Sequence, residues 1–260
     1  MKMSKTISTA MPIAKANGIT INGSIKCNRG NYDDCSKREI SHIVMHYTGN
    51  PSDSAKGNAN YFHNSVPETS AHYFVDEDNI YQSVDLCDIA WHAGDYSMNK
   101  KSIGIEMCTS GNYKISAKTI ENSVALVVEL CKLLGISSAD VDKYVIRHYD
   151  VIGKICPAQM AGENNAEWNA FKKSVKDKLN ASTEKMVKPT VRQLSIGMSG
   201  NDCVMLKVML KAKGYISFNP TANKKFGKKT KAAVHAFQKD NGIKQTGTVG
   251  INTWKALLRK

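Results

Sequence analysis

The segment Ser41–Gly49, SHIVMHYTG, does most to decide the fold, because its apolar stretch ends at a turn in the manner of a buried β-strand. Two similar strands are expected at Ser102–Cys108 (SIGIEMC) and Tyr144–Tyr149 (YVIRHY), and a hairpin at Ala71–Val84. Amphipathic helices are expected at residues 54–64, 116–134 and 167–179. Strands that alternate with helices predict an α/β fold with a mixed central β-sheet flanked by helices.

One segment with little apolar periodicity marks the expected boundary between two domains. Residues 181–190 have little apolar periodicity and include Pro189, so a linker is expected there. Three helical patterns follow it, over residues 202–213, 227–241 and 252–258. They predict a small three-helix domain at residues 191–260. The α/β domain is expected to occupy residues 1–180, with residues 1–40 irregular.

The whole net charge lies in the last 80 residues, which comprise the expected linker and the second domain. The 260 residues include 36 Lys and Arg and 23 Asp and Glu, which gives a formal net charge of +13. Residues 181–260 hold 16 basic and three acidic residues, whereas residues 1–180 hold 20 of each. This asymmetry indicates two modules with different partners, and an anionic partner for the basic one.

Composition disfavours several classes of protein. A hydrophobic content of 42% is ordinary for a folded chain. No run of about 18 apolar residues is present, so no membrane-spanning helix is expected. The first 20 residues lack the apolar core of a secretory signal. Seven cysteines, an odd number, then predict reduced thiols rather than a disulfide framework, and one of them could bind a metal or react.

Two of the seven histidines stand out by their position. His46 and His148 each lie at the C-terminal end of an expected strand, where α/β folds tend to assemble their sites. Cys156 follows His148 closely, and a thiolate with imidazoles is a donor set that suits zinc. Spacing alone is a weak signal, because a histidine is more often structural and Cys156 could equally be a small buried apolar residue.

Five segments, in order, resemble the zinc-dependent N-acetylmuramoyl-L-alanine amidases of type 2, a family of phage lysins, bacterial autolysins and peptidoglycan-recognition proteins. The segments are IVMHYTG (Ile43–Gly49), SAHYFVDEDNIYQSV (Ser70–Val84), AWHAGD (Ala90–Asp95), SIGIEMC (Ser102–Cys108) and RHYDVIGKICP (Arg147–Pro157). The resemblance covers residues 38–160 and implies a peptidoglycan hydrolase. Its substrate bond would be the amide between the lactyl group of N-acetylmuramic acid and the L-alanine of the stem peptide.

The resemblance also implies roles for matching residues. His46, His148 and Cys156 match the ligands of Zn²⁺, which is the expected cofactor. Glu106 matches the catalytic glutamate and is expected to act as general base. Lys154 matches the cation that stabilises the oxyanion. Without the motif, Glu106 would be taken as an ion-paired carboxylate at a strand edge, and Lys154 as a solvated loop charge.

Three further residues are candidate substrate-binding groups: His72, Trp91 and His92. His72 has the alternative role of hydrogen bonding to a residue that holds the metal. Trp91 has the alternative of packing in the core.

Residues 191–258 resemble the small helical peptidoglycan-binding module of many cell-wall hydrolases. The matching segments are Val191–Tyr215, Phe226–Ile243 and Thr246–Leu258. Two positions depart from the pattern: Lys207 replaces a glutamine and Thr246 an aspartate. The bundle core is expected to comprise Leu206, Leu210, Val234, Phe237, Trp254 and Leu257. The partner is expected to be bacterial peptidoglycan, with teichoic acids as a further anionic partner.

Other functions stay open at this level. A non-catalytic wall-recognition protein would use the same cleft. Nucleic-acid binding is suggested only by the basic domain, and no recognised motif supports it. We expect a monomer without membrane insertion that accumulates in the cytoplasm and reaches the wall through a holin pore. This describes a phage or prophage endolysin, with a bacterial autolysin as the alternative.

Overall fold

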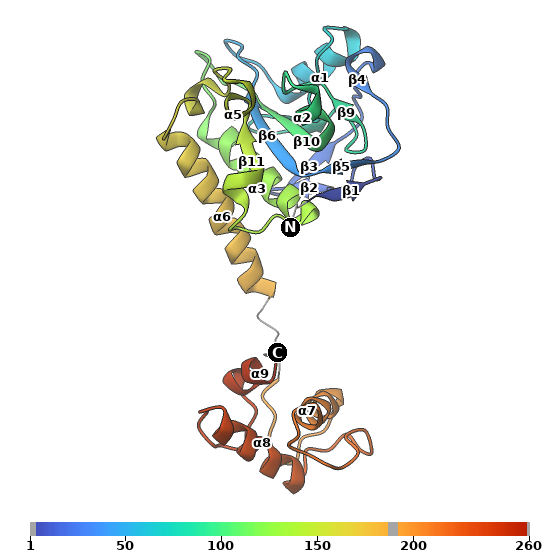
Figure 1. Ribbon diagram of the computed structural model, residues 1–260, viewed down its shortest axis with the longest axis vertical. Coiled ribbons are helices and arrows are strands. Elements are labelled where there is room, and N and C mark those ends of the chain that lie inside the picture. Colours follow the sequence, from blue (N-terminus) through green and yellow to red (C-terminus); the bar gives the residue numbers. More distant parts are fainter. Residues whose placement is uncertain (1–3, 187–191, 259–260) are drawn as a thin grey trace. The chain divides into compact units, whose positions relative to one another are not determined.

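The computed structural model describes the backbone of residues 4–186 and 192–258. The chain forms two compact units, Met1–Thr183 and Glu184–Lys260. The first is a mixed α/β unit and the second is helical, as the sequence predicts (Figure 1). No helix within the described ranges has the length and apolar character needed to cross a membrane.

A seven-stranded mixed sheet forms the centre of the first unit, in the order β11-β6-β10-β7-β8-β3-β2. These strands are β2 (Lys15–Ala16), β3 (Ile19–Asn22), β6 (His42–Tyr47), β7 (Tyr73–Val75), β8 (Ile80–Gln82), β10 (Ser102–Met107) and β11 (Val145–Arg147). The four strands from β11 to β7 run parallel, β8 runs antiparallel to β7, and β3 is parallel to β8. The expected mixed sheet is therefore confirmed.

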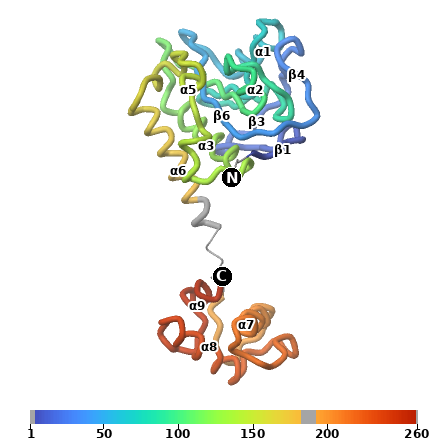
Figure 2. The backbone as a smooth tube through the Cα atoms, in the orientation of Figure 1, coloured from blue at the N-terminus to red at the C-terminus, as the bar shows by residue number. Residues whose placement is uncertain are grey.

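Six helices accompany the sheet within residues 4–186: α1 (Ala55–Asn64), α2 (Tyr96–Lys101), α3 (Ala117–Leu134), α4 (Val141–Tyr144), α5 (His148–Ile152) and α6 (Ala166–Met186). The boundaries of α3 follow from capping. The Ser116 side chain accepts a hydrogen bond from the Thr119 amide, and Gly135 ends the helix at φ +76°. Figure 2 shows that α5 lies beside β6, which is far from it in the chain.

The two faces of the sheet carry different side chains, because successive residues of a strand point to opposite sides. In β10, Ile103, Ile105 and Met107 join the main hydrophobic core, to which α3 and α6 contribute. The neighbouring residue Glu106 therefore points to the opposite face. On that face Phe74 of β7 packs with Ala55 and Ala59 of α1.

The expectation that residues 1–40 are irregular is wrong. They contain β2 and β3 of the central sheet, together with β1 (Lys5–Ile7), β4 (Tyr32–Asp33) and β5 (Arg38–Ile40). Strand β1 pairs with β5, and β4 pairs with β9 (Ile89–Ala90). Strands of two to four residues are too short to display periodicity, so pairing with other strands decides them.

Two boundaries differ from the expected ones. The strand expected at Tyr144–Tyr149 covers only Val145–Arg147, and His148 begins α5. Helix α6 continues to Met186, so the first part of the expected linker at 181–190 is helical. The rest of that linker, from residue 187, lies outside the described residues.

The second unit contains α7 (Asn201–Ala212), α8 (Lys228–Asp240) and α9 (Ile251–Leu257). Its hydrophobic cluster includes all six residues expected in the core: Leu206, Leu210, Val234, Phe237, Trp254 and Leu257. The three-helix prediction is confirmed, and the helical spacing of apolar residues was sufficient to make it.

Candidate metal centre

The site begins with two neighbouring strands. His46 in β6 lies directly opposite Glu106 in β10 in the parallel register. Both side chains point away from the main core, since the residues on either side of each belong to that core or pack on it. His46 is buried, and the unit therefore places an imidazole and a carboxylate together on one face of the sheet.

Two residues from beyond β11 complete a group of potential ligands. His148 Nδ1 lies 3.1 Å from His46 Nδ1, and Cys156 Sγ lies 3.8 Å from the same His46 atom. All three ligand atoms lie within 4.8 Å of one another. Zinc bonds of about 2.0–2.3 Å in tetrahedral geometry separate ligand atoms by about 3.3–3.8 Å, so this group fits a zinc ion. Three protein ligands would leave the fourth position open, as catalytic sites do.

A hydrogen-bond chain fixes the tautomer of His46. Its Nε2 lies 3.0 Å from His92 Nδ1, and His92 Nε2 lies 3.3 Å from Ser102 Oγ. The Ser102 hydroxyl donates its proton to the Met98 carbonyl at 2.7 Å, so it can only accept from His92. His92 then carries its proton on Nε2 and accepts at Nδ1 from His46 Nε2. The lone pair of His46 is left on Nδ1, which faces His148 and Cys156.

Gly104 leaves space for the His92 ring in this series of hydrogen bonds. A Cβ atom on residue 104 would lie 2.5 Å from His92 Cγ, closer than non-bonded atoms can approach. The glycine between Ile103 and Ile105 is therefore required to seat the His92 ring against the sheet.

Burial keeps the histidines of the site neutral. It lowers the pKa of His46 well below the usual value, and the neighbouring His92, His148 and Lys154 lower it further. The pKa values of His92 and His148 are lowered for the same main reason. Neutral imidazole is the form that binds metals. Burial raises the pKa of the Cys156 thiol to about 12, so metal binding must displace its proton.

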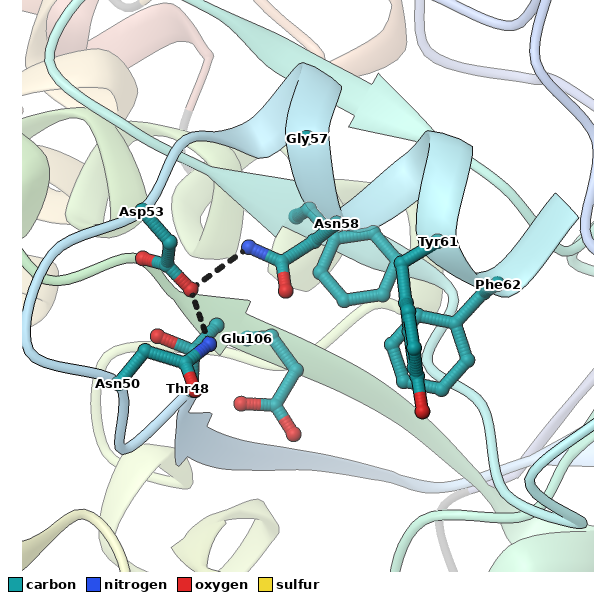
Figure 3. Close-up of a pocket in the computed structure, with 9 residues that line it drawn as sticks. Thr48, Asn50, Asp53, Gly57, Asn58, Tyr61, Phe62 and Glu106 are labelled. Atoms are coloured by element: carbon teal, nitrogen blue, oxygen red, sulfur yellow. Dashed lines mark hydrogen bonds between the residues drawn. The ribbon is translucent and has the colours of Figure 1, made fainter. Parts of the chain in front are cut away.

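Glu106 reaches from the sheet into an open pocket of about 550 Å³. Figure 3 shows its carboxylate between Thr48 and Tyr61, both of which line the pocket. Oε2 of Glu106 is buried and has no hydrogen-bond partner among the described residues. Burial raises the pKa of this carboxyl to about 8, against the opposing effect of Lys154. An unpartnered carboxyl beside the ligand group is suited to moving a proton of a bound molecule.

Lys154 and Trp91, which the sequence also indicated, have different relationships to this centre. Lys154 is exposed, and its charge acts on Glu106 and all three ligand residues. Trp91 is half-buried and donates from Nε1 to Asp33 at 3.0 Å. It is not among the residues that line the pocket.

His72 lies deep in the unit, with none of its surface exposed. Its Nδ1 accepts from the Gly104 amide at 3.0 Å, and its Nε2 contacts Arg38 Nη2 at 2.6 Å. Both ring nitrogens are thus occupied. This geometry argues against substrate contact by His72 and places it in the packing behind His92, whose ring centroid lies 5.8 Å away.

Sequence reasoning missed several residues of the site. Ser102 and Gly104 act through His92. Both lie in the segment SIGIEMC, but nothing in that segment alone indicates a contact with His92. Asp53 holds the pocket wall by accepting at 2.8 Å from both Asn50 and Asn58 (Figure 3). Asp53 also accepts from the Thr109 amide at 2.9 Å, and this contact joins segments that are far apart in the chain, so only the folded structure reveals it.

Comparison with known proteins agrees with this geometry. Residues 36–159 match the N-acetylmuramoyl-L-alanine amidase family, and residues 199–257 match a peptidoglycan binding domain. The N-acetylmuramoyl-L-alanine amidase CwlL of Bacillus licheniformis is 33% identical over 241 residues, which are 84% of this chain and 66% of that protein. A second protein of that species, named "Probable N-acetylmuramoyl-L-alanine amidase", is 32% identical over 91% of this chain and 72% of its own length.

A solved structure, described as a mutant endolysin from Bacillus subtilis, is 31% identical with a TM-score of 0.52. The match covers 60% of this chain and 99% of that one. This chain spans about two thirds of the length of the two relatives from Bacillus licheniformis.

Proposed function

This chain belongs to the N-acetylmuramoyl-L-alanine amidase family, and from that premise we propose that it is a zinc-dependent peptidoglycan hydrolase. It cleaves the amide between the lactyl group of N-acetylmuramic acid and the L-alanine of the stem peptide. One observation supports this proposal above all. The group of His46, His148 and Cys156 lies beside Glu106, which lines an open pocket and whose Oε2 has no hydrogen-bond partner among the described residues.

Each residue has a chemical role. Zn²⁺, when held by His46, His148 and Cys156, supplies the Lewis acidity that activates water and polarises the scissile carbonyl. Glu106 takes a proton from the attacking water and delivers it to the leaving amine of L-alanine. A pKa near the working pH suits this double task, because the same carboxyl must first accept and then release a proton.

Lys154 provides the positive charge for the transition state. Its side chain is exposed and its charge lowers the pKa of Glu106, which supports a role near the reaction centre. An ammonium there stabilises the negative charge that develops on the substrate carbonyl oxygen. It also favours the ionised form of Glu106 that is needed to accept the first proton.

The basic second unit holds the enzyme on its polymeric substrate. Its partner is bacterial peptidoglycan, and the excess of cations favours anionic groups such as peptide carboxylates and teichoic phosphates. The attraction raises the rate of encounter and weakens with salt. We infer that the protein acts as a monomeric endolysin that reaches the wall through a holin pore, with a bacterial autolysin as the second candidate.

Mass analysis of the fragments released from purified cell walls tests the proposed reaction. We expect intact glycan strands and newly freed L-alanine amino termini, and we expect a zinc chelator to abolish both. Glu106→Gln serves as the control that keeps the ligands but lacks the base. New reducing sugar ends would instead identify a glycosidase, and binding to walls without any cleavage would identify a recognition protein.

A further inference from the structure

A basic pocket lies in the second unit, where α8 begins. Its volume is about 480 Å³, and none of the described residues that line it is acidic. The polar and charged lining comprises Lys207, Lys225, Lys228, Lys229, Asn219, Asn223 and Thr230. Phe218 and Ala222 add an apolar part.

Lys207 gives this pocket a buried positive charge. Its side chain is only 1% exposed, although it lies on α7 of a small bundle. Its Nζ donates to the backbone carbonyl of Asn223 and lies 3.5 Å from the Asn223 Oδ1. No carboxylate within residues 192–258 forms an ion pair with it. A buried ammonium without a counter-charge is costly, and an anion in the pocket would remove that cost.

The start of α8 provides further donors to the same pocket. Gly227 is the N-cap and offers no side chain to accept from the first amides of the helix, and residues 228–230 line the pocket. The first turn contains no acidic residue, while Lys228 and Lys229 lie at the positive end of the helix dipole. Cations at this end slightly destabilise a helix, and an anion bound there would offset that effect.

We propose that this pocket binds the terminal carboxylate of a peptidoglycan stem peptide. The carboxylate lies between Lys207 and the first turn of α8. Phe218 and Ala222 contact the alanine methyl groups, and the Asn219 amide pairs with the peptide backbone. A polyol phosphate chain also has anionic groups, but it has no apolar group that could pack against Phe218 and Ala222. The proposal rests on the proposed function, because it names the part of the wall that the second unit recognises.

Titration of the full-length protein with defined probes tests the ligand. The probes are a synthetic stem peptide with a free C-terminal carboxylate, the same peptide as its C-terminal amide, and glycerol phosphate. Changes in the amide chemical shifts of residues 207 and 227–230 report on the pocket. We expect the acid to bind there about tenfold more tightly than the amide, since only the acid supplies the missing charge. Equal binding of the amide, or binding of glycerol phosphate alone, would overturn the assignment.

Variants of the pocket provide the second test. Lys207→Met removes the buried charge and keeps the apolar stem, and we expect the affinity for the peptide acid to fall about tenfold. Because Lys207 is buried, the double variant Lys225→Gln/Lys228→Gln is made as well, since it changes only exposed side chains. The control Lys211→Gln/Lys239→Gln removes the same number of charges from exposed positions outside the pocket.

The control should change peptide affinity by less than about twofold. An equal loss in both double variants would mean that net charge alone governs binding, which contradicts a defined site. Hydrolysis of a small soluble muropeptide is measured on the same preparations. The rate of this hydrolysis should be unchanged in every variant. A failure of the proposed amidase activity would instead appear in the unmodified protein, so the two outcomes are distinguishable.

Discussion

His46 Nε2 lies 3.0 Å from His92 Nδ1, and the two rings meet edge to face with an interplanar angle of 87°. This contact decides which nitrogen of His46 is free to hold zinc. The sequence suggested that His92 binds substrate. Its burial, and the contacts of its two ring nitrogens with His46 and Ser102, favour a positioning role behind the candidate metal centre.

Loss of this contact should weaken zinc binding. We expect His92→Ala to reduce zinc affinity about 10–100-fold, because the His46 ring loses the partner that fixes its tautomer and orientation. His92→Gln, whose side-chain oxygen can still accept from His46, should recover part of the loss. Competition with a chromophoric chelator measures the affinity directly, without reference to activity.

The control for that prediction is His63→Ala. His63 hydrogen bonds to the Lys26 carbonyl on an exposed part of the unit, so its loss should leave zinc affinity unchanged. Gly104→Ala should resemble His92→Ala, because the added methyl group displaces the His92 ring. Unaltered zinc affinity in both His92→Ala and Gly104→Ala would refute the positioning role.

Replacement of Glu106 should separate catalysis from metal binding. Glu106→Gln keeps the shape of the side chain but cannot take the proton, so we expect kcat to fall about 10²–10⁴-fold. Zinc content, measured by atomic absorption, should stay at the level of the unmodified protein. Glu129→Gln on the exposed side of α3 is the matched control, and full activity in Glu106→Gln would exclude the proposed base.

The ion pairs between α4 and α6 should make stability depend on pH. Asp142 lies 2.6 Å from Lys176 and 3.1 Å from Lys172, and these cations, Lys176 foremost, lower the pKa of its carboxyl. A lowered pKa in the folded state means that the stabilisation is present above the unfolded value of about 3.9 and is lost as pH falls through the folded value.

Asp142→Asn should therefore cost stability at pH 7 and cost nothing near pH 2, as measured by urea unfolding. The carboxylate is more than half exposed, so the effect should not exceed about 1 kcal/mol. Asp177→Asn is the control, because Asp177 pairs with Lys173 inside α6 and links no second element. A cost that persists unchanged at pH 2 would rule out the ion pairs as its source.

A fragment of residues 1–186 should keep the hydrolytic activity and lose most of its affinity for cell walls. It retains the whole first unit and the site residues, so it should bind zinc and hydrolyse small soluble muropeptides at the rate of the full chain. Sedimentation with purified walls should show weaker binding that no longer depends on salt, since the excess of cations has been removed. Salt-sensitive wall binding by the fragment would contradict this division of labour.

Local patterns of residues were sufficient to predict several parts of this protein. Long helices such as α3 and α8 follow from apolar spacing and capping, and β6 and β10 from their apolar runs. The ordered motifs also indicated His46, His148 and Cys156 as one group, which the fold brings within 4.8 Å. The helices and strands depend on residues that lie near one another in the chain. The three candidate ligands are far apart in the chain, and only the resemblance of the ordered motifs to a known family indicated that they form one group.

Tertiary structure alone decided the relationships between distant segments. The hydrogen bonds that link Met98, Ser102, His92 and His46 depend on how the loop that carries His92 packs against β10. Likewise, the two-residue strand β4 forms only because β9 lies beside it. The buried charge of Lys207 likewise depends on the loop that carries Asn223. Hydrogen bonds and burial between distant segments leave no periodic signal in the sequence, because each is set by how the elements pack.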